Sequence, residues 1–501
     1  MRSPRLAETP AIRRRTQHLE RRTADGVPFI IDERPDAFNP RSTVKIVMSV
    51  AALANRVTPL FAGDGLKAKA LRGSAWTFGG YGAQQVLRLG SNLILTRLLF
   101  PEAFGLMALV QVFMQGLAMF SDVGIGPAII QSKRGDDPDF LNTAWTIQVI
   151  RGFVLWLAAC GLAWPVARFY GEPLLAQMLP VAGLSAVIAG FNSTKLITAN
   201  RHLALGRLTA IELISQAISI LCLIGLAWSM RSVWALVIGT LIGTATKTVL
   251  AHAALPGAAN RLHWDRTSHR QLLGFGKYIF LSTVAGFMVN QGDRAILGYF
   301  LSAAEIGVYS IAVMLAMVPL EITRSLCQKV VFPLYAKRDA ACDPAVRDRI
   351  FHMRSAVTAL GLTAYLPMIL AGPWIISVLY DSRYQNAGSF LVLLSTAFAL
   401  KLITTSAIIA LLARGDSKRF LQLLLVLAIM NLSGMSAGIL FLGAIGAPIG
   451  IVAAELVSYP FVVVAVRHYG LFMPRHDITA IAVVMALCML SVAINDFSFL
   501  A

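Results

Sequence analysis

Long apolar segments, each close to twenty residues, recur along the chain and constrain its fold more than any other feature. A helix of about twenty residues spans the hydrocarbon core of a bilayer, because each residue adds about 1.5 Å. The chain is 56% hydrophobic and 14% charged, whereas soluble domains carry about 25% charged residues. A soluble domain is therefore excluded, and the sequence predicts an all-α polytopic membrane protein.

We expect about thirteen transmembrane helices. They are predicted over residues 74–99, 102–130, 140–168, 174–199, 208–229, 232–255, 274–300, 304–331, 353–380, 386–412, 419–441, 446–466 and 477–495. The connections are short and contain turn residues such as Pro101 and Gly415. None is long enough for a folded soluble domain, so the working site is expected within the membrane.

The net charge of +18 is explained by basic loops, and we expect no nucleic-acid partner. Alternate loops hold most of the Lys and Arg residues, which remain on the cytoplasmic side of a membrane. The amino terminus is therefore predicted to be cytoplasmic. The basic set contains Lys133, Arg134, Arg201, Arg207, Arg261, Arg266, Arg270, Lys337, Arg338, Arg347, Arg349, Arg414, Lys418, Arg419, Arg467 and Arg475, and the interleaved set contains Arg168, Arg231 and Arg383.

Residues 1–70 differ from the rest of the chain. They are polar and rich in arginine over 1–42, and we predict a disordered cytoplasmic extension with a short interfacial helix over 43–62. The five cysteines are scattered without paired spacing, so no disulfide or zinc framework is predicted. No cofactor and no metal site are expected.

The chain contains an internal repeat. Residues 71–109 resemble residues 272–311, with a Gly-rich entry, a polar helix, a short turn, and then Gly105 or Gly307 in the next helix. The alternative is a chance similarity between amphipathic helices. Because the offset is about 200 residues and an even number of spans lies between, the two halves would have the same orientation. Such halves commonly rock about a central site.

This repeat predicts two parallel-related six-helix bundles around a central cavity. The amino-terminal bundle is expected over 71–255 and the carboxy-terminal bundle over 272–468. A basic cytoplasmic linker over 256–271 joins them, and 477–495 forms an extra transmembrane helix.

Five segments of the chain carry a family resemblance. The segments are LTRLLFPEAFGLMALVQVFMQGLAMFSDVGIGPAIIQSK (95–133), LNTAWTIQVIRG (141–152), VWALVIGTLIG (233–243), NQGDRAILGYFLSAAEIGVYSIA (290–312) and KVVFPLYAK (329–337). They resemble Wzx-type polysaccharide flippases, the polysaccharide transporters of the multidrug/oligosaccharidyl-lipid/polysaccharide exporter superfamily. The resemblance implies a two-bundle fold that moves an undecaprenyl-pyrophosphate-linked oligosaccharide across the bacterial inner membrane. It also implies work alongside a polysaccharide polymerase and export machinery.

Charged residues within the predicted spans identify the candidate site, because each costs about 2.5–3.5 kcal/mol at the bilayer centre without a partner or a wet cavity. Cations in such a cavity would bind the phosphates of a lipid-linked substrate, and arginine binds phosphate in bidentate fashion. Arg88 lies about 20 Å along its helix, at mid-bilayer depth. The candidate substrate-binding cations are Arg88, Arg294, Lys401, Arg151 and Lys247, and the candidate structural or ion-coupling carboxylates are Asp122, Glu212, Asp293, Glu321 and Glu455.

Each candidate has a structural alternative. Arg294 could pair with Asp293 or extend to the interface. Arg151 and Lys247 could pair with structural carboxylates, as could Glu212 and Glu455. Asp122 could cap the turn at Gly124–Gly126. Glu321 and Arg324 are three residues apart on one helical face and could satisfy each other.

The leading hypothesis is a flippase for lipid-linked oligosaccharide repeat units, without covalent chemistry, working by alternating access for exopolysaccharide, capsule or O-antigen synthesis. A drug or organic-cation antiporter of the same superfamily is the alternative within transport, but it predicts a cavity of carboxylates and aromatics. A membrane-bound polysaccharide polymerase or ligase is the alternative enzyme class. It predicts a sizeable external loop that carries catalytic residues, and no such loop is predicted here.

Overall fold

The computed structural model describes residues 66–122, 124–269, 272, 287, 291–335, 344–467, 469 and 472–495. Within these residues every regular element is a helix. Of the predicted extension over 1–70, only residues 66–70 are described, and they begin the first helix; the rest lies outside the described residues.

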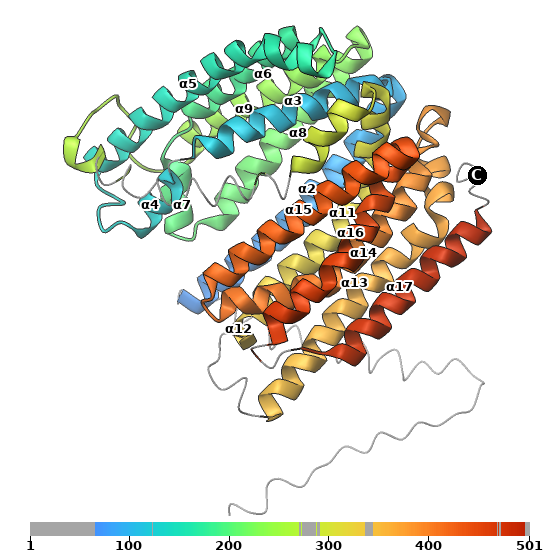
Figure 1. The fold of residues 1–501 in the computed structure, drawn as a ribbon. Coiled ribbons are helices and arrows are strands. Elements are labelled where there is room, and N and C mark those ends of the chain that lie inside the picture. Colours follow the sequence, from blue (N-terminus) through green and yellow to red (C-terminus); the bar gives the residue numbers. More distant parts are fainter. Residues whose placement is uncertain are drawn as a thin grey trace, which may run out of the picture. The chain divides into compact units, whose positions relative to one another are not determined.

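The amino-terminal half contains eight helices, drawn in blue to green in Figure 1. They are α2 (Leu66–Leu98), α3 (Pro101–Phe120), α4 (Ile125–Gln131), α5 (Pro138–Tyr170), α6 (Leu175–Gly190), α7 (Lys195–Arg201), α8 (Leu205–Met230) and α9 (Trp234–Ala254). Two of the predicted single spans are each divided. The span over 102–130 breaks into α3 and α4 at Gly124, whose φ of 67° places it in the left-handed region. The span over 174–199 forms α6 and α7, which are bent by 58°.

The carboxy-terminal half contains the helices drawn in yellow to red. They are α11 (Ala303–Leu326), the π-helical turn η1 (Cys327–Val331), α12 (Phe332–Tyr335), α13 (Pro344–Leu379), the 3₁₀ turn η3 (Ser382–Tyr384), α14 (Ala387–Ala413), α15 (Ser417–Leu442), η4 (Gly443–Ile445), α16 (Gly446–Arg467) and α17 (Pro474–Ile494). Residues 291–300 are also helical, while most of the predicted helix 274–300 lies outside the described residues.

These helices have the length and apolarity of a multi-pass membrane protein. Nine segments of the described chain are long and apolar enough to span a bilayer, or ten if α6 and α7 together form one bent span. The expectation of an all-α polytopic membrane protein is confirmed. The predicted thirteenth span is a helix, α17, which packs against α13 and α14.

Within each half, helices pack on sequence neighbours and on some helices further along the chain. In the amino-terminal half α5 packs on α6, α8 on α9, and α6 on α9. In the carboxy-terminal half α13 packs on α14, α14 on α16, and α15 on α16 (Figure 1). The α15–α16 contact is very close, because a Cβ on Gly438 would lie 2.0 Å from the carbonyl oxygen of Gly446. Small residues at helical spacing permit such backbone contact.

The two halves meet through equivalent residues of the repeat. A Cβ on Gly105 of α3 would lie 1.8 Å from the carbonyl oxygen of Ala303, and a Cβ on Gly307 of α11 would lie 1.9 Å from that of Pro101. Pro101 and Ala303 are the first residues of α3 and α11. Position 303 follows 101 by 202 residues, as 307 follows 105. The contact therefore has approximate two-fold symmetry, which chance similarity between helices does not explain.

Candidate functional site

A polar stripe runs along α2. Tyr81, Gln85, Arg88 and Asn92 recur at steps of three and four residues, so they share one face of the helix. The amide Nδ2 of Asn92 donates to the sulfur of Met314 on α11 at 2.9 Å. The stripe therefore faces the carboxy-terminal half.

A second polar group joins α3 to the helix over 291–300. Gln291 Nε2 donates to Gln115 Oε1 at 2.9 Å, and Arg294 Nη1 donates to Gln291 Oε1 at 3.4 Å. Gln291 is 8% exposed. Arg294 is thus held at the boundary between the two halves.

Arg88 and Arg294 lie close enough for their positive charges to repel each other. Among the described residues neither guanidinium forms an ion pair with a carboxylate. Asp293, the neighbour of Arg294 in sequence, has a buried Oδ1 without a hydrogen-bond partner in the described chain. The pairing of Arg294 with Asp293, one alternative from the sequence, is therefore not formed within the described residues.

Further unsatisfied polar atoms lie on Arg294 itself and on the following helix, α11. In the described chain Arg294 Nε, Tyr309 Oη and Ser310 Oγ are buried without hydrogen-bond partners. Tyr309 lies within electrostatic reach of both Asp293 and Arg294. A buried polar group left unsatisfied costs about 1–3 kcal/mol. A polar ligand therefore gains more here than against the satisfied polar groups elsewhere.

The repeat register shows how Arg88 and Arg294 are related. With the offset that equates 105 with 307, Arg88 corresponds to Asn290 and Asn92 corresponds to Arg294. Each half therefore contributes one arginine and one asparagine, four residues apart and in opposite order. The two cations belong to the same helix of the repeat, but they are not equivalent positions.

Arg151, a predicted cavity cation on α5, contacts the carboxy-terminal end of α3 through its side chain. Its Nε donates to Ser121 Oγ at 2.9 Å and its Nη2 donates to the carbonyl oxygen of Ala118. These acceptors are the last groups of α3, so Arg151 caps that helix. Asp122 caps the following turn, since its Oδ1 accepts from the backbone N–H of Gly124 at 2.9 Å.

Lys247 and Glu212 lie together. Lys247 Nζ is 3.5 Å from Glu212 Oε1, and Gln84 Nε2 on α2 donates to Glu212 Oε2 at 3.2 Å. The two charged side chains are 38% and 46% exposed. The structure thus places Lys247 beside a carboxylate that links α8 and α9 to α2.

Three candidates belong to the carboxy-terminal half. Glu321 lies 3.8 Å from Arg324 in a partly exposed pair. Glu455 is 5% exposed, accepts from Asn431 Nδ2 at 3.2 Å, and lies within electrostatic reach of Lys401. Lys401 on α14 is partly buried and Glu455 on α16 is buried, and they lie on other helices than Arg88 and Arg294.

One buried ion pair was missed by the sequence reasoning. Arg354 Nη2 lies 2.7 Å from Asp477 Oδ1, and the side chains are 1% and 4% exposed. Tyr459 Oη also donates to Asp477, and Arg354 Nε donates to Ser406 Oγ at 3.0 Å. The predicted spans begin at 353 and 477, so both residues looked interfacial. The signal was two opposite charges at the first turns of two spans.

Comparison with known proteins identifies the family. A family described as "Polysaccharide biosynthesis protein" matches residues 94–389, more than half of the 501 residues. The chain belongs to this family. The match includes Arg294 and the contact between Gly105 and Gly307, while Arg88 lies just before it.

Individual relatives are distant. The chain is 20% identical over 402 residues to the lipopolysaccharide biosynthesis protein WzxC of Escherichia coli (strain K12), which covers 78% of this chain and 80% of WzxC. It is 20% identical over 300 residues to the teichuronic acid biosynthesis protein TuaB of Bacillus subtilis (strain 168). The latter match covers 59% of this chain and spans only 61% of the length of TuaB.

Solved structures with a similar fold are membrane transporters. The lipid II flippase MurJ, in an inward closed conformation, superposes with a TM-score of 0.63 at 14% identity, over 86% of this chain and 95% of MurJ. An inward-facing multidrug resistance transporter of the MATE family superposes with a TM-score of 0.58 at 14% identity, over 77% of this chain and 95% of that chain. The chain therefore shares the fold of these two transporters.

Proposed function

We propose that this protein is a flippase that moves a polyprenyl-pyrophosphate-linked oligosaccharide across the bacterial inner membrane. The repeat units would then serve exopolysaccharide, capsule or O-antigen synthesis. The observation that carries the proposal is the pair Arg88 and Arg294, two cations without a carboxylate partner in the described chain, at the boundary between the halves. The relatives' roles in lipopolysaccharide and teichuronic acid biosynthesis support a saccharide cargo.

The chemistry of this pair suits a diphosphate. A pyrophosphate carries several negative charges, and its oxygens accept the paired N–H groups that a guanidinium presents. Bringing two like charges together costs energy, and an anion bound between them removes that cost. The amides of Asn92, Gln115 and Gln291, which line the same boundary, are suited to sugar hydroxyls.

The orientation follows from loop charge. With the basic loops in the cytoplasm, the amino terminus is cytoplasmic and the Gly105–Gly307 contact lies at the outer side of the membrane. Two more links join the halves at that side: Tyr384 Oη donates to the carbonyl oxygen of Leu99 at 3.1 Å, and Arg383 Nη2 donates to that of Thr96 at 3.0 Å. The structure then represents a state closed to the outside, from which alternating access begins.

The division into working parts follows the repeat. We propose that 71–255 and 272–468 act as the two moving bundles, joined by the linker over 256–271, with 477–495 as an added helix. Glu455 and Lys401 are the best candidates for ion coupling, because a carboxylate that is 5% exposed beside an amine changes the local charge on protonation. A polysaccharide polymerase and export machinery are the expected partners.

Two other functions are weaker. An antiporter for organic cations needs an anionic cavity, whereas Arg88 and Arg294 give the boundary between the halves a positive bias. A polymerase or ligase needs catalytic side chains presented outside the membrane. The described connections at the proposed outer side, such as residues 171–174 and 231–233, are too short for a catalytic domain.

The test is leaflet-resolved detection of lipid-linked glycan in a deletion strain complemented with variants. We expect Arg88→Gln and Arg294→Gln to leave the protein in the membrane but to trap lipid-linked repeat units on the cytoplasmic leaflet. Glu321→Gln, at the partly exposed pair on α11, is the matched control and should restore export. Normal polymer output from the Arg88→Gln/Arg294→Gln double variant would contradict the proposed site.

A further inference from the structure

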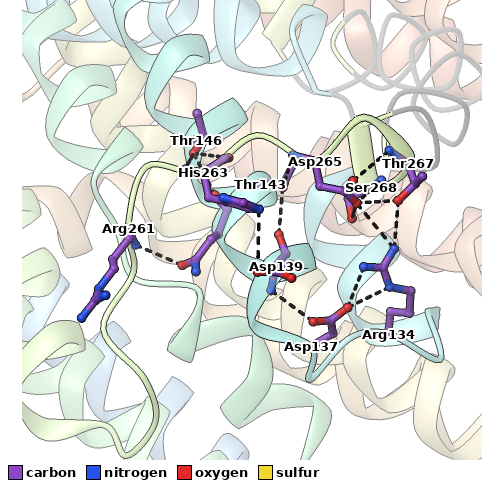
Figure 2. Close-up of polar contacts among 11 residues, drawn as sticks. Arg134, Asp137, Asp139, Thr143, Thr146, Arg261, His263, Asp265, Thr267 and Ser268 are labelled. Carbon is purple, nitrogen blue, oxygen red and sulfur yellow. Dashed lines mark hydrogen bonds and ion pairs between the residues drawn. The ribbon is translucent and has the colours of Figure 1, made fainter.

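The linker segment, residues 260–268, lies against the first turns of α5 in a regular way (Figure 2). Alternate backbone N–H groups of the segment donate to side chains of α5: Arg261 to Asn142 Oδ1 at 3.0 Å, His263 to Thr146 Oγ1 at 3.0 Å, and Asp265 to Thr143 Oγ1 at 3.1 Å. Thr146 Oγ1 also donates to the carbonyl oxygen of His263. A step of two residues is that of an extended chain.

These contacts explain a motif left unused by the transport site. Asn142, Thr143 and Thr146 belong to the segment LNTAWT over 141–146. Positions 142 and 146 are one turn apart on the same face of the helix. An extended segment outside a sheet has no neighbouring strand to accept its backbone N–H groups. Here the three polar side chains of α5 accept them. The motif therefore holds the linker segment on the amino-terminal half.

A polar lock closes each end of the linker segment. At its start Asn260 Nδ2 donates to Thr194 Oγ1 at 2.7 Å, and its Oδ1 accepts from Ser193 Oγ at 2.8 Å. At its end the carboxylate of Asp265 accepts from the backbone N–H and the hydroxyl of Ser268, at 2.9 and 2.6 Å. Arg134 lies 3.7 Å from the same carboxylate. The only carboxylate of the segment is thus engaged within the protein.

The linker segment exposes both apolar and basic side chains. Leu262 is 71% exposed and Trp264 is 49% exposed. The centroid of the Trp264 ring lies 4.6 Å from that of the His269 imidazole ring. Arg261 and Arg266 are also exposed. Alternate residues of an extended chain point in opposite directions, so Leu262 and Trp264 share one side of the linker segment. Arg261 precedes them, and Arg266 begins the helical turn that follows.

The height of the linker segment along α5 corresponds to the headgroup layer of the bilayer. α5 has 33 residues and is about 50 Å long, whereas the hydrocarbon core is about 30 Å thick. With α5 centred on the core, about 10 Å extends beyond the core at each end. Asn142, Thr143 and Thr146 fall within the first nine residues of α5. The linker segment consequently lies close to the lipid phosphates at the basic end of the helices.

We propose that the linker segment binds anionic phospholipid headgroups of the cytoplasmic leaflet. Arg261 and Arg266 would pair with lipid phosphates, and Leu262 and Trp264 would enter the interface, where amphipathic rings are favoured. This contact anchors the linker at membrane height while the halves move. It does not depend on which cargo the protein carries.

Trp264 itself provides the probe. The full-length protein is reconstituted in vesicles that contain either brominated phosphatidylglycerol or brominated phosphatidylcholine, since bromine quenches only nearby indoles. We expect stronger quenching by the anionic lipid, and the difference should be absent in Trp264→Phe. Trp374, which is 65% exposed on α13, is the matched control, and Trp374→Phe should keep the full difference.

The charge and the docking are tested separately. Arg261→Gln/Arg266→Gln should remove the preference for the anionic lipid without changing thermal stability. Thr146→Val should loosen the segment and weaken the preference, while Thr146→Ser retains the hydroxyl and should preserve it. Equal quenching of Trp264 by the two lipids would overturn the proposal. So would no quenching by either lipid, which would leave a water-exposed surface suited to a soluble partner.

Discussion

Gly105 on α3 and Gly307 on α11 pack against each other's helix starts, so closely that neither position has room for a side chain. A Cβ on Gly307 would also lie 3.2 Å from the backbone nitrogen of Gly105. The same residue of each repeat therefore contacts the same residue of the other. This reciprocal contact joins the two halves, and under the proposed orientation it lies where the outer side closes.

We expect Gly307→Ala to weaken this closure. Added bulk at a tight contact costs about 1–3 kcal/mol, which corresponds to about a 5- to 150-fold shift in a conformational equilibrium. Spin labels at positions 102 and 304 should then report a longer distance, and polymer export should fall because the closed state is depleted.

Gly225→Ala is the control for that substitution. Gly225 lies on α8 with nothing within 4 Å of its Cβ position, so alanine should leave both the distance and the export unchanged. An unchanged label distance in Gly307→Ala would show that the contact yields without separating the halves.

We expect substitution of Arg88 to reduce export and substitution of Arg151 to reduce thermal stability. Arg88 has no side-chain hydrogen bond in the described chain, whereas Arg151 binds Ser121 and Ala118. Arg88→Lys keeps the charge but loses bidentate binding, so export should drop about 10- to 150-fold, the equivalent of one charged hydrogen bond, while thermal stability is kept. Arg151→Lys should lower the thermal stability instead.

The two readouts separate binding from folding. Transport in vesicles normalised to the amount of folded protein measures the first, and thermal unfolding in detergent measures the second. A loss of stability in Arg88→Lys equal to that in Arg151→Lys would assign Arg88 to structure and remove it from the site.

Most of the fold could be predicted, because a membrane-spanning helix is determined by the length and apolarity of its own segment. The length and composition of the apolar segments around α8, α14 and α16 are enough to predict a membrane-spanning helix at each. The charges of the loops predict the orientation of the chain. The break at Gly124 was foreseen only as one alternative, a turn capped by Asp122, while the span was predicted as continuous over 102–130. The structure ends α3 at Phe120 and places Gly124 at a φ of 67°.

The candidate site was open to prediction in part. Arg88 and Arg294 were proposed from their positions within the predicted spans, which needs no tertiary information, and their binding of cargo stays a prediction. The role of Arg151 could not be read in this way, because its partners are a carbonyl oxygen and a hydroxyl on another helix. The role of Asp477 was not predicted for a similar reason. Its partner Arg354 is 123 residues away, and each residue lies at the start of a predicted span, where a charge is ordinary.

The Arg354–Asp477 pair should hold α17 in place. Removing one partner of a buried pair leaves an uncompensated charge and costs about 3–5 kcal/mol. We expect Asp477→Ala to lower the thermal midpoint strongly and to expose α17 to protease. The double variant Arg354→Met/Asp477→Leu should recover much of the loss.

Glu321→Gln, in a pair that is 52% and 37% exposed, should cost about 0–1 kcal/mol. Equal effects of Asp477→Ala and Glu321→Gln would deny the pair this role.

The end of the linker segment should withstand mild acid. Hydrogen bonds from Ser268 and Thr267 hold the pKa of Asp265 well below its usual value. A lowered pKa in the folded state means that the stabilising contribution is present above the unfolded pKa, about 4, and is lost only as the pH falls through the folded value. Hydrogen exchange over residues 261–269, corrected for intrinsic rates, should therefore be flat from neutral pH down to about pH 5 and should rise in stronger acid. Asp265→Asn should exchange faster at neutral pH and should lose the rise in acid. Exchange in the wild type that does not rise in stronger acid would show that the Asp265 carboxylate does not hold this end of the linker segment.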